Sequence, residues 1–228
     1  MSDHEQDFFI ISHRGASYYM PENTLSSFQK ALDMNTDMIE LDVRRSLDNK
    51  LVVIHDKTLN RTTNGTGPVS QKTYEELSRY DAGEGEKIPL LEDVFSLGKG
   101  KTRFVIELKE ERTEDQVLKM IKDFNIRDDV FIVSFNKKMI KYITTFEKDI
   151  RTGLISLFPF NILENGLRCN TDAIAVFKYF ISESLISKAH LNNLYIFAWT
   201  VNEPTKCRQL RNMGINGVVT NKPDILTL

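Results

Sequence analysis

Several features that this sequence lacks narrow what the chain can be. It has only two cysteines, Cys169 and Cys207, and their spacing matches neither a disulfide framework nor a thiolate metal site. We therefore expect two reduced thiols, in the core or at the surface. The net charge is only −2, so no strong overall field attracts nucleic acid or a membrane. Any basic residue that matters must act locally.

Long apolar segments are also missing. No run of the sequence reaches the length needed to span a membrane. The first residues, M-S-D-H-E-Q-D-F-F-I-I-S, lack the basic start and long apolar stretch of a signal peptide. We therefore expect a cytoplasmic protein with no stable membrane insertion and no nucleic-acid partner.

The composition that remains is that of a globular protein. Hydrophobic residues make up 41% of the chain and charged residues 27%. A length of 228 residues is enough for one large hydrophobic core, and two domains are the less favoured alternative. We expect a single domain over residues 1–228.

The segment 38–56, M-I-E-L-D-V-R-R-S-L-D-N-K-L-V-V-I-H-D, predicts a β-hairpin. Two apolar runs flank Asp48 and Asn49, and these residue types tolerate the left-handed backbone of a tight turn. We expect residues 44–47 to pair antiparallel with residues 50–53. We also expect this returning arm to lie outside the barrel core.

The register of this hairpin would gather charged side chains on one face. With Asp48 and Asn49 as a two-residue turn, Asp42 lies opposite His55. Glu40 shares the face of Asp42, because strand side chains alternate. Two carboxylates on an apolar strand are costly to bury unless they are paired or bind a cation. The alternative is that both are solvated residues of an amphipathic strand.

Without the returning arm, eight apolar segments remain, separated by helices or long connections. They start near Phe8, Met38, Arg103, Val130, Thr152, Ala173, Tyr195 and Gly217. This alternation is typical of parallel strands. Eight such units in a chain of this length predict a (β/α)8 TIM barrel with the hairpin at its C-terminal rim. An open doubly wound sheet is the alternative, but no glycine-rich fingerprint follows the first strand.

Two helix starts and one insertion can be placed within this frame. The residues Pro21-Glu22-Asn23-Thr24 precede apolar residues at helical spacing. The run Thr113-Glu114-Asp115-Gln116 has the pattern of a capping box that opens a helix. Residues 57–87 are polar and contain several glycines, so we expect a small insertion with one short helix over 74–80. Residues 161–168 give no clear assignment.

Polar residues cluster after the strands at one end of the predicted barrel. They are His13 and Arg14 after the first strand, Glu40 and Asp42 at the end of the second, and Glu107 and Lys109 at the end of the third. Active sites of such barrels lie at the carboxyl ends of the strands. Taken singly, each residue could be an ordinary surface group, but their joint placement favours a site. Phe135 and Trp199 are candidates for the rim that contacts the substrate.

The residue types point to chemistry on a phosphate. Three carboxylates, Glu40, Asp42 and Glu107, suit the hard cations Mg²⁺ or Ca²⁺. Neither cysteines nor a spaced histidine pair indicate zinc. Two cations, Arg14 and Lys109, suit a phosphate group. His13 and His55 could serve as base and acid, which together describes metal-assisted phosphodiester cleavage.

Several motifs resemble the glycerophosphodiester phosphodiesterase family. They are Ser12-His13-Arg14-Gly15-Ala16, Pro21-Glu22-Asn23-Thr24, Glu40-Leu41-Asp42-Val43, His55-Asp56, Arg61-Thr62-Thr63-Asn64-Gly65, Ile88-Pro89-Leu90-Leu91-Glu92, Glu107-Leu108-Lys109, Trp199-Thr200-Val201-Asn202 and Gly217-Val218-Val219-Thr220-Asn221-Lys222-Pro223. The blocks are dense over 10–110 and return over 194–224. Where the family often has Thr-Asp near the end, this chain has Asn221, which puts any role of that residue in doubt.

The resemblance implies a barrel enzyme that hydrolyses glycerophosphodiesters to sn-glycerol 3-phosphate and an alcohol. It implies a divalent metal on Glu40, Asp42 and Glu107, and a phosphate clamp of Arg14 and Lys109. His13 and His55 would be the acid–base pair, and analogy with related barrel phospholipases makes His13 the base. Water or the glycerol 2-hydroxyl could be the nucleophile.

Other functions remain open from the sequence. They are a lysophospholipase D on lipid substrates, a cyclising phospholipase C on inositol lipids, and an inactive barrel that serves as a binding module. A lipid enzyme needs an apolar surface near its site. The runs Phe158-Pro159-Phe160 and Tyr18-Tyr19-Met20 are candidates for it, although packing in the core is the favoured role for both.

Overall fold

The computed structural model describes residues 8–227, and within them eight parallel strands close into a ring. The strand order is β1-β9-β8-β7-β6-β5-β4-β2, and β1 also pairs with β2. These strands are β1 (Phe9–Ser12), β2 (Met38–Arg45), β4 (Arg103–Leu108), β5 (Val130–Ser134), β6 (Arg151–Ser156), β7 (Ala173–Phe177), β8 (Tyr195–Trp199) and β9 (Gly217–Thr220). The TIM barrel is confirmed, and each strand starts within one residue of its predicted position.

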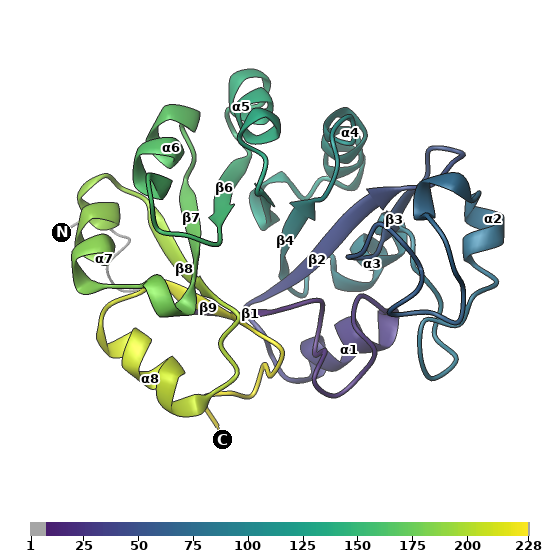
Figure 1. Cartoon of the computed structure of the whole chain (residues 1–228), viewed down its shortest axis with the longest axis horizontal. Coiled ribbons are helices and arrows are strands. Elements are labelled where there is room, and N and C mark those ends of the chain that lie inside the picture. Colours follow the sequence, from purple (N-terminus) through teal and green to yellow (C-terminus); the bar gives the residue numbers. More distant parts are fainter. Residues whose placement is uncertain (1–7, 228) are drawn as a thin grey trace.

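Helices follow most of the strands and cover the outside of the ring. They are α1 (Leu25–Asp33), α2 (Tyr74–Leu77), α3 (Leu91–Gly98), α4 (Glu114–Phe124), α5 (Lys137–Phe146), α6 (Ile162–Cys169), α7 (Glu183–Leu191) and α8 (Pro204–Asn212). Figure 1 shows α4 to α8 arranged around the strands, with the hairpin and the insertion projecting on the other side. Among residues 8–227, no helix combines the length and the apolar character needed to cross a bilayer.

Local sequence explains one of the two predicted helix starts and not the other. The Thr24 hydroxyl accepts a hydrogen bond from the Ser27 amide, which caps α1 as such residues commonly do. The capping box predicted at Thr113 was wrong. Its hydroxyl donates instead to the Glu110 carbonyl at 2.8 Å, and it makes no cap bond to α4. Residues 161–168, left unassigned from the sequence, belong largely to α6.

The barrel has one apolar core inside the ring and others between the ring and its helices. Phe28, Phe95 and Phe104 are fully buried between the strands and helices α1 and α3. Burial of each such side chain contributes about 1.5–3 kcal/mol. Both cysteines are buried and free, which agrees with the expectation of reduced thiols.

The hairpin has the predicted direction but a different register. Strand β3 (Leu51–Val53) pairs antiparallel with β2, with Val43 opposite Val53. In this register Ile54, and not His55, lies opposite Asp42, and the Ile54 amide donates to the Asp42 carbonyl at 3.0 Å. Our placement of His55 opposite Asp42 was therefore wrong by one residue.

The shift has a clear cause in the turn. The loop has three residues, because the Ser46 amide bonds to the Lys50 carbonyl at 3.0 Å. The third loop residue, Asn49, adopts the left-handed conformation with φ 61°. A three-residue loop with a left-handed last residue is a common hairpin connection, and it moves the pairing by one position.

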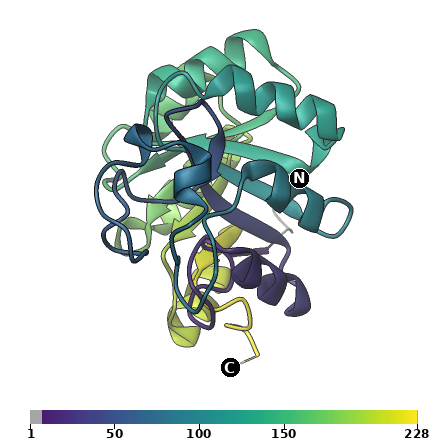
Figure 2. The same ribbon diagram turned by 90° about the vertical axis from the view of Figure 1, so that its right-hand side faces the viewer.

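The returning arm is part of the core, contrary to our expectation. Residues 51–54 are all buried: Leu51 and Val53 pack in the core between the strands and helices, and Val52 and Ile54 pack against the insertion. The insertion contains the short 3-10 helix η2 (Val69–Gln71) and α2, which is shorter than predicted. Figure 2 shows this segment lying across one side of the barrel, so it is placed to support residues near the barrel mouth.

Candidate active site

Three carboxylates meet at the ends of β2 and β4. Glu40, Asp42 and Glu107 are buried, and each offers an oxygen within 4.8 Å of those of the other two. The two strands are parallel neighbours with Asp42 level with Glu107, which explains why the cluster forms. The strand alternation predicted from the sequence therefore does bring all three side chains together.

Burial and charge repulsion raise the pKa values of two carboxylates in this cluster. Burial, followed by the neighbouring Asp42, raises the pKa of Glu107 from 4.5 to about 7. Burial and the charges of Asp42 and Glu107 raise the pKa of Glu40 well above its usual range. Such a site favours either protons or a cation of high charge.

The donor set fits a divalent metal ion. Asp42 Oδ1 is buried and has no hydrogen-bond partner among residues 8–227, and its nearest cation is Lys109 Nζ at 3.4 Å. A buried acceptor without a partner is costly, and a cation would satisfy it. All three ligands are carboxylates, which suits Mg²⁺ or Ca²⁺.

The residues before α1 hold this acidic cluster in place. Asn23 donates through Nδ2 to Asp42 Oδ2 at 2.9 Å and is itself buried. Arg14 Nε lies 3.1 Å from the same carboxylate oxygen. Together with Lys109, Arg14 keeps the pKa of Asp42 low although burial acts in the opposite direction.

The backbone at Arg14 and Gly15 is shaped for the site. Arg14 has a positive φ of 57°, and its amide donates to Glu40 Oε2 at 2.8 Å. Gly15 follows with φ 79°, and a Cβ there would lie 2.4 Å from Ser27 Oγ. Only glycine fits this position, which gives the His-Arg-Gly run a structural reason. An unusual backbone of this kind often occurs at functional sites.

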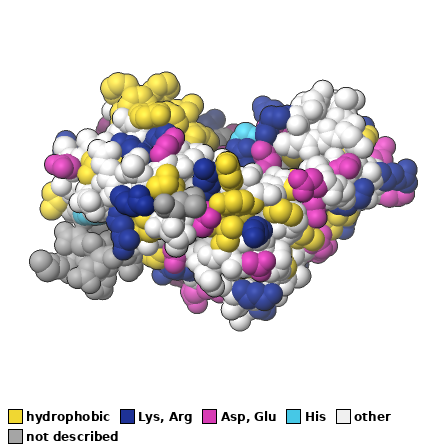
Figure 3. Space-filling view, turned by 90° about the horizontal axis from the view of Figure 1, so that it is seen from below, with side chains coloured by type: hydrophobic (Ala, Val, Ile, Leu, Met, Phe, Trp, Pro, Cys, Tyr) yellow, Lys and Arg dark blue, Asp and Glu magenta, His cyan; other side chains and the backbone are white. Residues whose placement is uncertain are grey.

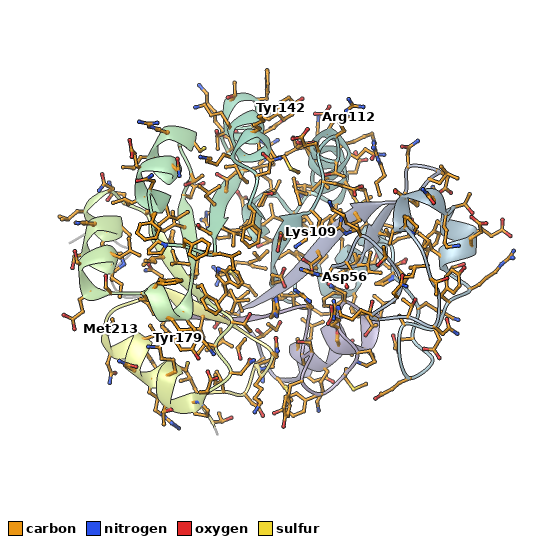
Figure 4. All side chains as sticks on the ribbon, in the orientation of Figure 1. Asp56, Lys109, Arg112, Tyr142, Tyr179 and Met213 are labelled. Atoms are coloured by element: carbon orange, nitrogen blue, oxygen red, sulfur yellow. The ribbon has the colours of Figure 1, made fainter. Side chains whose placement is uncertain are left out.

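The two cations lie on either side of the carboxylates. Lys109 Nζ contacts Glu107 Oε1 at 2.6 Å and lies 5.9 Å from the centre of the Phe135 ring. Arg14 Nη1 contacts Glu22 Oε1 at 2.8 Å. Figure 4 labels Lys109 and Asp56 close to the middle of the molecule, near the ends of β2 and β4.

His13 is held by a neutral partner. Its Nδ1 lies 2.7 Å from the Asn221 amide oxygen, which can only accept a hydrogen bond. In this arrangement Nδ1 carries the proton and Nε2 is left as an acceptor. Burial, followed by the charge of Arg14, lowers the pKa of His13 to about 4.

His55 is held by a charged partner. Its Nδ1 lies 2.6 Å from Asp56 Oδ1. Arg61 donates to both oxygens of Asp56, at 2.8 and 3.0 Å, and also to both oxygens of Glu22. Burial lowers the pKa of His55, although Asp42 and Asp56 both act to raise it.

Five residues of this network were not assigned a role from the sequence. They are Glu22, Asn23, Asp56, Arg61 and Asn221. All of them lie in the motifs quoted above, so motif membership was the available signal. Their partners come from distant parts of the chain, and sequence spacing alone does not reveal such contacts.

A cavity of about 220 Å³ connects these groups. His13, Arg14, Glu40, His55 and Glu107 line one part of it. The remainder is apolar and includes both predicted rim residues, together with Val133, Ile155, Ala175 and Phe197. The site therefore has a polar part, at β1, β2, β4 and the segment after β3, and an apolar part that comes mostly from β5 to β8.

Comparison with known proteins agrees with this geometry. Residues 13–225 match the model of the glycerophosphoryl diester phosphodiesterase family. The chain belongs to this family. It is 36% identical to the protein YhdW of Bacillus subtilis over 96% of each chain. It is 34% identical to a glycerophosphodiester phosphodiesterase of Caldanaerobacter subterraneus subsp. tengcongensis, covering 95% of each chain.

Solved structures of the glycerophosphoryl diester phosphodiesterase family show the same fold. A glycerophosphodiester phosphodiesterase from Agrobacterium tumefaciens superposes with a TM-score of 0.86 at 28% identity, covering 96% of this chain and 98% of the other. The sequence resemblance to this family is thus confirmed, and with it the barrel that the resemblance implied.

Proposed function

We propose that this chain is a metal-dependent hydrolase that converts glycerophosphodiesters to sn-glycerol 3-phosphate and an alcohol. The observation that carries this proposal is the pair of histidines on the same cavity as Glu40 and Glu107, two of the three clustered carboxylates. Family membership supports the substrate class. The substrate is a small molecule whose phosphate would lie between the histidines.

Glu40, Asp42 and Glu107 would hold Mg²⁺ or Ca²⁺. The bound cation supplies positive charge beside the phosphodiester and makes a neighbouring hydroxyl more acidic. Arg14 and Lys109 would add to this charge by contacting phosphate oxygens. Both side chains already pair with carboxylates of the acidic cluster. A bound phosphate would therefore either share these cations with the carboxylates or replace the carboxylates as their partner.

The partners of the two histidines support a division of labour. His13 pairs with an amide and has a low pKa, so it is neutral near pH 7 and can accept a proton at Nε2. Burial lowers the pKa of His55 as well, but the carboxylates of Asp42 and Asp56 act against this and favour its protonated ring, whereas the direct partner of His13 is an uncharged amide. We therefore assign His13 as the base and His55 as the acid that protonates the leaving alcohol.

Product analysis with glycerophosphocholine tests the proposal. Release of sn-glycerol 3-phosphate and choline is expected, because cleavage of the P–O bond to choline leaves the phosphate attached to glycerol. Release of glycerol and phosphocholine would instead indicate cleavage of the other P–O bond, as in a phospholipase C-type reaction, and would contradict the proposal. Glycerol cyclic phosphate as the end product would show that the glycerol 2-hydroxyl displaces choline and that hydrolysis does not follow. Absence of any product at saturating metal and substrate would favour a binding module and contradict the proposal.

A further inference from the structure

Arg44 differs from nearly all other cationic residues because its charge is buried. Among residues 8–227, Arg44 and Lys178 are the only buried arginine or lysine residues. The others are at least partly exposed, and Figure 3 shows several of them in dark blue among acidic side chains. Tyr18, Phe158 and Phe160 are also exposed, by 62%, 57% and 79%, so the core packing favoured for them from the sequence is wrong. A charge is costly to bury unless it is paired, so the partners of Arg44 indicate its role.

The guanidinium group of Arg44 joins the backbone of His55 to an acidic side chain. Its Nε donates to the His55 carbonyl at 2.8 Å, and its Nη1 lies 3.4 Å from Glu110 Oε2. The other buried cation, Lys178, contacts both oxygens of Glu203, at 3.0 and 2.8 Å. Of the two buried cations, Arg44 is thus the one that is bonded to a histidine of the active site.

Glu110 follows β4 and fixes the position of Arg44. Just before it, the Lys109 amide donates to the Val43 carbonyl of β2 at 3.2 Å. Glu110 Oε1 then accepts a hydrogen bond from the Arg45 amide at 2.9 Å. One oxygen of Glu110 thus extends the pairing of β2 with β4, and the other faces Arg44. The side chain of Arg44 is therefore tied to the two strands that carry the metal-ligand candidates.

His55 needs this support because it lies beyond the end of β3. The Ile54 amide still donates to the Asp42 carbonyl at 3.0 Å, and the chain bends after this bond. The His55 carbonyl then accepts its hydrogen bond from the Arg44 side chain. Asp56 holds the ring at Nδ1, at 2.6 Å. Asp56 thus orients the imidazole, while Arg44 fixes the backbone that carries it.

The position of Arg44 indicates that it acts through His55 and not on the substrate. Among the described residues that line the cavity, His55 is present and Arg44 is not. Strand alternation places Arg44 on the same face of β2 as Glu40 and Asp42, one step further along the strand. A displacement of about 1 Å in a reacting group can cost a large factor in rate, so a fixed backbone at His55 matters for catalysis.

We propose that Arg44 is a positioning residue that holds His55 where its Nε2 can protonate the leaving alcohol. This inference rests on the proposed function and deepens it. In the step concerned, the nucleophile attacks phosphorus and the P–O bond to the head group breaks. The electron pair of that bond goes to the alcohol oxygen, which takes the proton from His55.

A pair of substrates that differ in the leaving group tests this role. They are glycerophosphocholine and the p-nitrophenyl ester of sn-glycerol 3-phosphate, both at saturating metal. The p-nitrophenolate anion is a weak base and leaves without a proton, whereas the oxygen of choline needs one. In Arg44→Met, kcat for glycerophosphocholine should fall about tenfold. Its kcat for the p-nitrophenyl ester, and KM for both substrates, should stay close to the parent values.

Further variants set the scale of this effect. His55→Ala should show the same dependence on the leaving group more strongly, because it removes the acid itself. Arg44→Lys should lose less activity than Arg44→Met, because lysine keeps the charge and can donate one hydrogen bond. The matched control is Arg45→Met, which changes the next arginine of β2 on the opposite face of the strand. This control should match the parent on both substrates.

Glu110→Gln tests the same contact without removing the buried arginine. It takes away the charge that faces Arg44 and keeps a side-chain oxygen for the Arg45 amide. A smaller loss of kcat, confined to glycerophosphocholine, is expected. If circular dichroism shows that Arg44→Met is unfolded, Arg44→Lys and Glu110→Gln decide the question.

The outcomes separate this inference from the proposed function. Parent-like kcat on glycerophosphocholine in the folded Arg44 and Glu110 variants would overturn the inference, and the proposed function would stand. An equal loss on both substrates would show a merely structural role and would also overturn it. If His55→Ala loses both substrates equally, His55 is not the acid, and the role given to Arg44 fails with that assignment. A parent enzyme that hydrolyses neither substrate would contradict the proposed function itself.

Discussion

At the scale of residues, the two histidines differ chiefly in what holds them. His13 has an amide partner and His55 a carboxylate that is itself held by an arginine. Both partners fix the proton on Nδ1 and leave Nε2 for the substrate side. The proposed assignment of opposite roles rests on these partners, because a carboxylate favours a protonated ring more than an amide oxygen does.

Replacing either histidine should remove most of the activity. His13→Ala and His55→Ala should each lower kcat by about 10²–10⁴-fold, the usual contribution of a positioned acid or base. Steady-state kinetics on glycerophosphocholine, with circular dichroism to verify folding, measures this. His190→Ala is the control, since His190 pairs with Asn216 away from the cavity. His4, which we also expect to be dispensable, lies outside the described residues. Near-normal turnover of either active-site variant would show that its assigned role is wrong.

The acidic cluster predicts how metal and pH act together on stability. The folded-state pKa of Glu107 is raised from 4.5 to about 7, so the stability gained from its protonation is complete below pH 4.5 and is lost as pH rises through about 7. A divalent cation replaces the proton, and it stabilises the folded state by binding to it.

The melting temperature should therefore respond to metal in a pH-dependent way. Mg²⁺ or Ca²⁺ should raise Tm more above pH 7 than near pH 4.5. Differential scanning fluorimetry with metal and with chelator measures the difference. In Glu107→Gln, the difference between the Tm with metal and the Tm with chelator should be small at both pH values. A metal effect that is equal at both pH values in the parent would contradict the account.

At the scale of elements, the insertion supports the catalytic residues from outside the barrel. Arg61 lies in this segment and bonds both to Asp56, the partner of His55, and to Glu22, the partner of Arg14. It thereby links the two sides of the site through one guanidinium group. The insertion is small, but it carries a contact that the barrel strands do not provide.

Arg61→Ala should lower kcat about tenfold, because supporting partners of site residues have effects of this size. The pH profile should also shift, since Asp56 loses the arginine that keeps its pKa low. Arg61→Lys should lose less activity than Arg61→Ala, because lysine keeps the positive charge although it cannot make the two parallel hydrogen bonds of arginine. Arg79→Ala is a matched control in the same insertion, where Arg79 pairs with Glu75 on an exposed surface. If Arg61→Ala behaves like the control, Arg61 has no positioning role.

The direction of the hairpin could be predicted from the sequence, but its register could not. Its direction and approximate position followed from two apolar runs around Asp48 and Asn49. Its register depended on whether Asn49 is inside a two-residue or a three-residue loop, and both are compatible with the same residue types. The chain after β3 still carries His55 to the cavity, although through a bend after Ile54 and not by direct pairing with Asp42.

At the scale of the whole molecule, the barrel could be predicted because each strand is a short apolar run bounded by polar segments. The metal-ligand candidates could be predicted because strand alternation places Glu40 beside Asp42 on one face. The supporting contacts could not be predicted, because they join residues far apart in the chain, such as His13 and Asn221.

The barrel thus joins a polar part that suits a phosphate to an apolar part, and both line the same cavity. Strands β1, β2 and β4 and the segment after β3 supply the histidines, the carboxylates and the cations, and β5 to β8 supply most of the apolar wall. The account depends on the three carboxylates holding one divalent cation that catalysis requires.

The most direct test of this dependence is to measure metal binding and turnover together in the parent and in Asp42→Asn. After exhaustive chelation, glycerophosphocholine turnover by the parent should stop, and Mg²⁺ or Ca²⁺ should restore it with the same concentration dependence as binding measured by calorimetry. Asp42→Asn should stay folded by circular dichroism and lose both binding and turnover. Full activity of the chelated parent, or an Asp42→Asn variant that binds metal and turns over substrate like the parent, would contradict the account.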